Sequence, residues 1–163
     1  MKETKFDNER DKLFQAVTVD ASKFMSIDLL KDKPSDIVKS INEAIVGSVF
    51  GHQIPILADD EADLLLACLW GSQMVREFDW VWRNIHHENG FEIAVCSPER
   101  DMVIYPLAFV EACLQKRCIC TVALSFNTLL ERKGEIIYNP YDYVNIMQHI
   151  AHVVPPYTLE EKG

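Results

Sequence analysis

The sequence predicts an α+β fold in which an antiparallel three-stranded meander is packed with about five helices. Three observations carry this prediction. A long apolar helical stripe runs directly into a tryptophan-rich segment, three short β-type segments then alternate with turn residues, and helical spacing returns afterwards. We expect residues 1–163 to form a single domain, in which residues 1–33 are a candidate for a less ordered N-terminal extension.

Two well-patterned helices are expected before the strands. Apolar residues recur at helical spacing over Pro34–Val49, and Gly51 follows as a C-terminal cap. The main helix is expected over Asp59–Phe78, with Gly71 in its apolar stripe. Because an interior glycine costs about 1 kcal/mol relative to alanine, its position predicts close approach by another element. A shorter helix is expected around Asn8–Val17.

The meander is predicted from β-branched and aromatic residues between turn signals. The strands are expected over Asp79–His86, Phe91–Cys96 and Met102–Tyr105. Turns are expected at Glu88-Asn89-Gly90 and Ser97–Asp101, where polar residues and glycine favour chain reversal.

Three helices are expected after the meander. Pro106 suits the first position of a helix over Pro106–Lys116. The segment Cys118–Lys133 is ambiguous between strand and helix, and its apolar spacing, closed by Gly134, favours a helix. Asn139-Pro140 is expected to open a last helix that extends through Ala151.

Composition and charge restrict the classes of function. The formal net charge is −9, and residues 35–100 carry four basic and eleven acidic side chains, a net charge of −7. This sign opposes binding to nucleic-acid phosphates and favours a basic partner. Five cysteines, an odd number, favour a reducing cytosol over a disulfide framework. With neither a signal peptide nor an apolar run long enough to span a bilayer, we expect a soluble cytoplasmic protein that does not enter membranes.

The densest acidic cluster comprises Asp59, Asp60, Glu61 and Asp63. One interpretation is helix capping, in which Asp59 or Asp60 binds the first-turn amides and the other carboxylates complement the helix dipole. The functional interpretation is a contact patch that accepts Arg and Lys side chains from a basic partner. The two interpretations are compatible, because a cap requires only one or two of the four.

Two pairs near the predicted first strand are further candidates for partner contact. Trp80 and Trp82 share one strand face, so they are interface anchors if Val81 and Ile85 face the core. If the tryptophans face inward, they are core residues, and we expect this for at least one of them. The adjacent His86 and His87 lie at the strand end, where they are either simple polar residues or partner contacts.

Residues that could carry chemistry do not form a recognisable catalytic motif. His149 and His152 have the i, i+3 spacing of a metal pair, but both lie away from the apolar stripe of the last helix, which indicates a solvated face. Cys118-Ile119-Cys120 lacks the spacing of a zinc knuckle. Pairing of Cys113 or Cys118 with a histidine has no local signature. We therefore expect no metal, no cofactor and no catalytic residues.

One part of the chain resembles a group of small uncharacterised bacterial α+β domains. The resemblance lies within residues 59–107 and is carried by Trp70-Gly71, Val75, Phe78–Trp82, Ala94–Arg100 and Tyr105–Leu107. Members of that group recur among immunity-type proteins encoded beside secreted polymorphic toxins. The resemblance therefore implies a toxin-neutralising role, and it brings no catalytic residues with it.

The leading functional hypothesis is an immunity-type binding protein that occludes a cognate secreted toxin. The alternatives are an adaptor or chaperone-like module for a secreted effector and an unrecognised enzyme that uses a Cys or His pair. Homodimerisation through an edge strand of the meander is left open.

Overall fold

The structure is a computed structural model that describes residues 2–133, 135 and 137–151. Five strands form one sheet: β1 (Lys2–Thr4), β2 (Val81–His87), β3 (Gly90–Cys96), β4 (Met102–Ile104) and β5 (Val144–Asn145). The described residues also form six α-helices and a short 3₁₀ helix, η1 (Pro55–Ala58). The α-helices are α1 (Asn8–Phe24), α2 (Pro34–Val49), α3 (Ala62–Phe78), α4 (Pro106–Leu114), α5 (Val122–Glu131) and α6 (Ile146–Ala151).

The α+β class is confirmed, and the predicted meander forms the centre of a larger sheet. The strand order is β1-β2-β3-β4-β5, with β1 to β4 paired antiparallel and β5 paired parallel to β4. The expectation of three antiparallel strands was therefore incomplete, because the sheet is mixed and has five strands. The two additional strands lie at its edges and contain three and two residues, too few for a period-two pattern.

Both broad sides of the β2–β3 hairpin pack against other parts of the chain. Cross-strand pairing places Trp82 beside Val95 and His86 beside Phe91 on one face. That face meets α1, whose Phe14 packs against Trp82. On the other face Ile85 clusters with Val103 and with the rings of Tyr105 and Tyr143, and these form part of the site described below.

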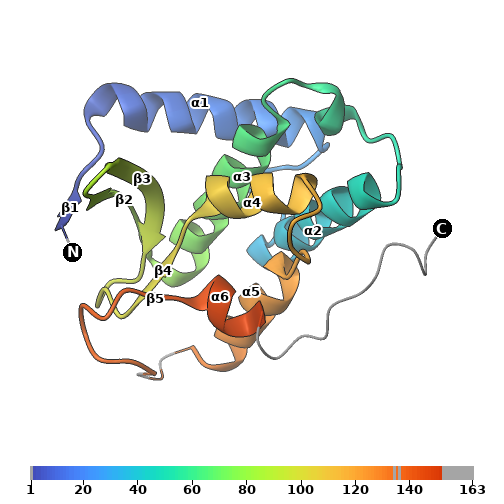
Figure 1. Cartoon of the computed structure of the whole chain (residues 1–163). Coiled ribbons are helices and arrows are strands. Elements are labelled where there is room, and N and C mark those ends of the chain that lie inside the picture. The colour runs from blue at the N-terminus through green and yellow to red at the C-terminus, as the bar shows by residue number, and fades with distance from the viewer. Residues whose placement is uncertain (1, 134, 136, 152–163) are drawn as a thin grey trace.

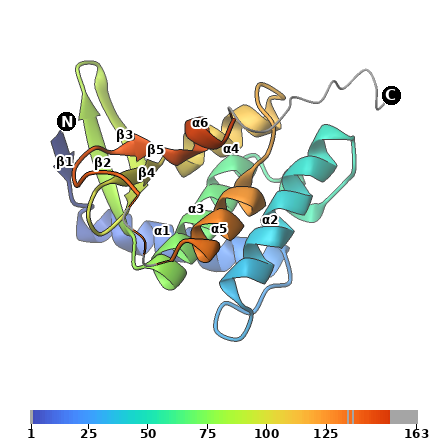
Figure 2. The same ribbon diagram turned by 90° about the horizontal axis from the view of Figure 1, so that it is seen from below.

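The β2–β3 hairpin and helix α2 occupy opposite ends of the molecule (Figure 1). Between them α3 crosses the centre, with α1 along one side and α4 along another (Figures 1 and 2). The two views also place η1 and the start of α3 far from the β2–β3 hairpin. This separation matters for the function, because the candidate contact residues are divided between these regions.

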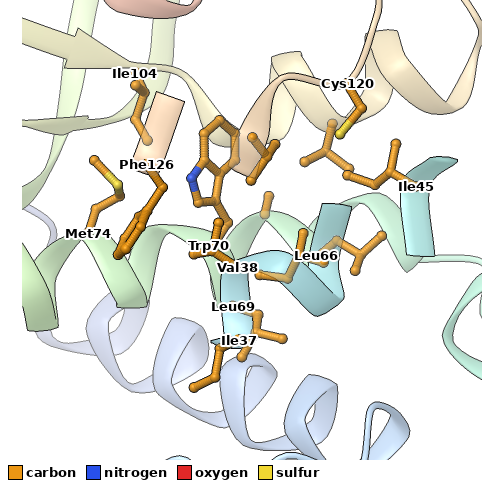
Figure 3. Packing of buried hydrophobic residues seen from close by; sticks show 14 of the residues in the cluster. Ile37, Val38, Ile45, Leu66, Leu69, Trp70, Met74, Ile104, Cys120 and Phe126 are labelled. Atoms are coloured by element: carbon orange, nitrogen blue, oxygen red, sulfur yellow. The ribbon is translucent and has the colours of Figure 1, made fainter. Parts of the chain in front are cut away.

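The core is built around α3, which is enclosed on nearly all sides. Every residue from Leu65 to Gly71 is buried, as expected for a helix that is apolar around most of its circumference. Figure 3 shows Leu66, Leu69, Trp70 and Met74 of α3 facing side chains from the surrounding elements. The neighbouring core residues include Ile37, Val38 and Ile45 of α2, Ile104 of β4 and Phe126 of α5.

Gly71 permits the close contact between α3 and the sheet that its position predicted. A Cβ atom built on this glycine would overlap atoms Cζ2 and Cη2 of the Trp82 ring. The predicted close approach is therefore confirmed, and the approaching group is a tryptophan from β2.

The helix at the N-terminus is longer than predicted. It begins after Asp7, whose carboxylate accepts a hydrogen bond of 2.8 Å from the amide of Arg10, and it continues to Phe24. Its buried residues Phe14 and Ala21 and the preceding Phe6 belong to the core. The apolar residues of this segment are widely spaced, so the sequence pattern indicated only the first part of the helix.

The last helix begins later than predicted. Asn139 and Pro140 lie in a turn, and Tyr141 and Tyr143 have φ values of 63° and 45°, outside the helical region. This segment instead pairs with the turn after β3, where the amides of Tyr143 and Val144 donate to the carbonyls of Arg100 and Asp101. The helix therefore starts at Ile146. For α5 the helical prediction is confirmed within Val122–Glu131, and the predicted closing residue Gly134 lies outside the described residues.

Candidate functional site

A groove of about 650 Å³ lies between the end of the β2–β3 hairpin, the start of α4 and the β5–α6 segment. Strand β2 and its hairpin partner contribute His87 and Glu92, and Tyr105 precedes α4. Cys118, from the connection after α4, and Tyr143, from the loop before β5, line the same groove. Five side chains that can exchange protons thus line one concavity.

The hairpin side of the groove is polar and exposed. His87 Nε2 lies 3.5 Å from a carboxylate oxygen of Glu92, and both side chains are about half exposed. Such a pair contributes little to stability because solvent screens it, so both groups are accessible to a bound molecule. Burial and the charge of Glu92 raise the pKa of Tyr105 to about 12, so its hydroxyl is protonated and can donate a hydrogen bond at neutral pH.

The Tyr143 side chain is held in place by a half-buried carboxylate on β1. Glu3 accepts hydrogen bonds from Tyr143 Oη at 2.6 Å, Arg100 Nε at 2.7 Å and Arg83 Nε at 2.9 Å. Burial alone would raise the pKa of Glu3, but the hydrogen bonds from Arg100, Tyr143 and Arg83 lower it overall. The ring of Tyr143 is therefore fixed to the edge of the sheet, although its backbone has a left-handed φ of 45°.

The predicted acidic cluster lies at the other end of the molecule, before and within the first turn of α3. Asp60 and Glu61 are exposed and Asp59 and Asp63 are half-buried. Asp59 accepts a hydrogen bond of 2.8 Å from the amide of Glu61, and no side chain caps the helix itself, which begins at Ala62. The predicted cap by Asp59 or Asp60 was therefore wrong. The chain is still in a turn at Asp60 and Glu61, so the helix begins at Ala62 and not at Asp59.

The two tryptophans belong to the interior. Trp80 is 3% exposed and lies between α3 and β2, with its ring centroid 6.4 Å from that of Phe78. Trp82 is partly buried and stacks on Phe6, with ring centroids 5.8 Å apart. The expectation that at least one tryptophan is a core residue is confirmed. The alternative of exposed anchors does not apply to Trp80, because its ring is covered.

The two adjacent histidines have different environments because successive residues of a strand face opposite sides. His86 is partly buried on the α1 face, where its Nε2 atom lies 2.8 Å from the hydroxyl of Thr4. His87 is exposed at the groove. Of the predicted contact residues, His87 is the one that the structure places beside the groove, and neither Asp59–Asp63 nor the tryptophans lie there.

The last helix shows the solvated face that its sequence indicated, as far as it is described. His149 is exposed, and its ring packs edge-on against Tyr138 with centroids 6.0 Å apart. His152 lies outside the described residues. Within the described part of the chain, no group of three or more His, Cys, Asp or Glu side chains is arranged to hold a metal ion.

Sequence reasoning did not identify Glu92, Tyr105 and Tyr143 as members of a site. Glu92 and Tyr105 lie in predicted strands, for which the sequence pattern gave no functional role. Tyr143 fell within a predicted helix. The available signal was the turn chemistry of Asn139-Pro140, which favours a loop as much as a helix start.

No protein-family model, curated protein or solved structure matches this chain. Among the described helices, none has the length and apolar character needed to cross a membrane. Function is therefore inferred from the surface and the groove.

Proposed function

We propose that this chain is an immunity-type binding protein that neutralises a cognate secreted toxin in the cytoplasm by direct occlusion. We further propose that the toxin contacts the tip of the β2–β3 hairpin and the adjoining groove. The observation that carries the proposal is Phe91, a large aromatic side chain that is 48% exposed at the hairpin tip. Aromatic residues that a partner can bury are the usual energetic anchors of protein interfaces.

The surroundings of Phe91 suit it to this role. Arg10 lies over its ring at 5.2 Å from the centroid, and the His86 ring lies 5.8 Å away on the neighbouring strand. A ring that is already held loses little rotamer freedom when a partner covers it, so more of the contact energy remains as affinity. Figure 2 shows the tip of the hairpin projecting beyond the neighbouring helices, which makes both of its faces accessible.

The exposed carboxylates of the hairpin favour a basic partner. Glu88 and Glu92 are exposed there, and the whole chain carries a formal net charge of −9. Carboxylates at the rim of an interface mainly raise the association rate and exclude acidic partners, while the buried anchor determines the dissociation rate. The acidic segment Asp59–Asp63 is the competing contact surface, and charge alone supports it.

The proposal is tested by co-expressing the chain with the protein encoded beside it and scoring growth and co-purification together. Rescue of growth with a stable complex supports neutralisation. A complex without rescue supports the adaptor or chaperone-like alternative. Neither rescue nor binding at micromolar concentrations would show the immunity hypothesis to be wrong.

A second candidate function is a thiol-dependent enzyme. The observation that favours it is that Cys118 and the His87–Glu92 pair line the same groove, so a thiol, an imidazole and a carboxylate have access to one bound molecule. Toxin neutralisation by occlusion does not require the thiol, whereas catalysis through it does. Cys118→Ser therefore separates the two, because it is expected to leave rescue and binding unchanged if the chain is a binding protein.

A further inference from the structure

The turn that ends α4 brings two cysteine thiols together. Lys116 adopts a left-handed φ of 61°, and its amide donates to the carbonyl of Cys113 at 3.0 Å. The amide of Arg117 donates to the carbonyl of Ala112 at 2.9 Å, which completes a Schellman motif and reverses the chain. As a result, Cys118 returns over the end of the helix, and its sulfur lies 3.4 Å from the sulfur of Cys113.

The two thiols differ in their access to solvent. Cys118 is half-buried and lines the groove, whereas Cys113 is fully buried in the core. Cys113 also interacts with Cys120, and this hydrogen bond together with burial raises the pKa of Cys113 above its usual range. The sulfur of Cys120 lies 3.3 Å from Oδ1 of Asn42, which holds it against α2. An oxidant entering the groove therefore meets Cys118 first.

We propose that Cys113 and Cys118 form an oxidisable dithiol, a modification site whose co-reactant is a hydroperoxide. This inference does not depend on the proposed binding function. Its basis is the short sulfur–sulfur distance between an accessible and a buried thiol. A disulfide needs a sulfur–sulfur distance of about 2.05 Å, so the 3.4 Å separation must close by only about 1.3 Å.

The reaction proceeds in two balanced steps. The Cys118 thiolate attacks one oxygen of the hydroperoxide, the O–O bond breaks, and hydroxide or alkoxide leaves, which gives a sulfenic acid on Cys118. The sulfur of Cys113 then attacks the Cys118 sulfur, the S–O bond breaks, and the hydroxyl group leaves as water with the proton of the Cys113 thiol. The peroxide is reduced by two electrons and the thiol pair is oxidised by two electrons.

The chain contains its own reference thiols. Cys68 and Cys96 are fully buried. Burial raises the pKa of each to about 12, and at Cys96 the charge of Glu3 acts in the same direction. Because neither Cys68 nor Cys96 is exposed to an oxidant in solvent, both are expected to stay reduced, while Cys118, which lines the groove, is oxidised first and then links to Cys113.

The test is to treat the dilute, reduced protein with one equivalent of hydrogen peroxide, alkylate the remaining thiols and map the cysteines by mass spectrometry after trypsin digestion. Trypsin cleaves after Lys116 and Arg117, so a Cys113–Cys118 disulfide joins two separate peptides. Because Cys118 and Cys120 share the second of these peptides, the linked pair is fragmented between the two residues to identify which of them is bonded to Cys113. We expect the Cys113–Cys118 link, with a mass lower by two hydrogen atoms and with two of the five free thiols lost. Cys118→Ser should abolish the link, and the matched variant Cys120→Ser should retain it.

Several results would overturn the proposal. One is a Cys113–Cys120 disulfide in the protein without substitutions, and another is a disulfide between two chains. The others are sulfinic acid on Cys118 without a disulfide, or no oxidation under conditions that oxidise free cysteine. The fragment assignment in the protein without substitutions remains decisive even if a variant folds poorly.

Discussion

Replacing Gly71 by alanine places a methyl group against the Trp82 ring. The new Cβ atom overlaps two ring atoms, whereas carbon atoms pack best at about 3.5–4.0 Å. The rings of Phe6 and Phe14, with centroids 5.8 and 5.1 Å from that of Trp82, restrict its movement, although the ring also borders a cavity of about 340 Å³. Overpacking costs roughly 1–3 kcal/mol, and alanine regains about 1 kcal/mol of helix propensity. Because the two phenylalanine rings let Trp82 move aside only in part, we expect Gly71→Ala to lower the free energy of unfolding by about 1–2 kcal/mol.

The Trp82→Phe background should reverse the sign of this effect. Phenylalanine lacks the outer indole ring that meets the new methyl group, so Gly71→Ala should then be neutral or stabilising by up to about 1 kcal/mol. The coupling between the two substitutions is therefore expected to be about 2 kcal/mol. Urea denaturation of the four proteins measures it. A stabilising Gly71→Ala in the original background, or equal effects in both backgrounds, would refute the reasoning.

Three further predictions concern stability. Glu3→Gln should cost about 1–3 kcal/mol at pH 7, because its partners lose a charged acceptor. Since the folded pKa of Glu3 lies below its ordinary value of 4.5, its contribution is complete above that pH and is lost as the pH falls through the folded pKa. Urea titrations at several pH values should therefore show the two proteins converging in acid, and a constant gap would contradict this. Ser97→Ala removes the hydroxyl that donates to the buried Asp101 carboxylate at 2.6 Å, so thermal denaturation should show a loss of about 1.5–3 kcal/mol that Thr at this position partly restores. Lys116→Gly should stabilise the chain by about 1 kcal/mol by relieving a left-handed φ of 61°, and an equal gain from Lys116→Ala would contradict that explanation.

The elements with a strong sequence period were predicted best. The helices α2 and α3 and the strands β2 and β3 follow from regular apolar spacing or alternation, and Gly71 even indicated the contact of α3 with another element. The short strand β4 was found instead from its apolar residues between a turn and Pro106. The edge strands β1 and β5 could not be found in this way, because strands of two or three residues have no measurable period. The start of α6 was misplaced because a proline that suits the first turn of a helix also suits a loop, and here the loop bonds to the turn after β3.

The candidate site was predicted only in part, for a physical reason. Alternation along β2 divides its side chains into two faces, but it identifies the inner face only when one side is solvated. Here both faces are covered, with Trp82 against α1 and Ile85 against Tyr105 and Tyr143, so the sequence left the tryptophans ambiguous. His87 was identified because it lies at the strand end. His87 and Cys118 line the same groove because of the path of the chain after α4, and no local sequence pattern predicts that path.

The most direct test of the proposed function compares dissociation constants of matched variants for the protein encoded beside this chain. Glu92→Lys and Asp60→Lys change the net charge equally, one at the hairpin and the other in the distant acidic segment, and both positions are exposed. We predict that Glu92→Lys and Phe91→Ala each weaken binding by about tenfold or more, whereas Asp60→Lys changes it by less than about threefold. A larger loss for Asp60→Lys, or equal losses for both charge reversals with none for Phe91→Ala, would contradict binding at the hairpin.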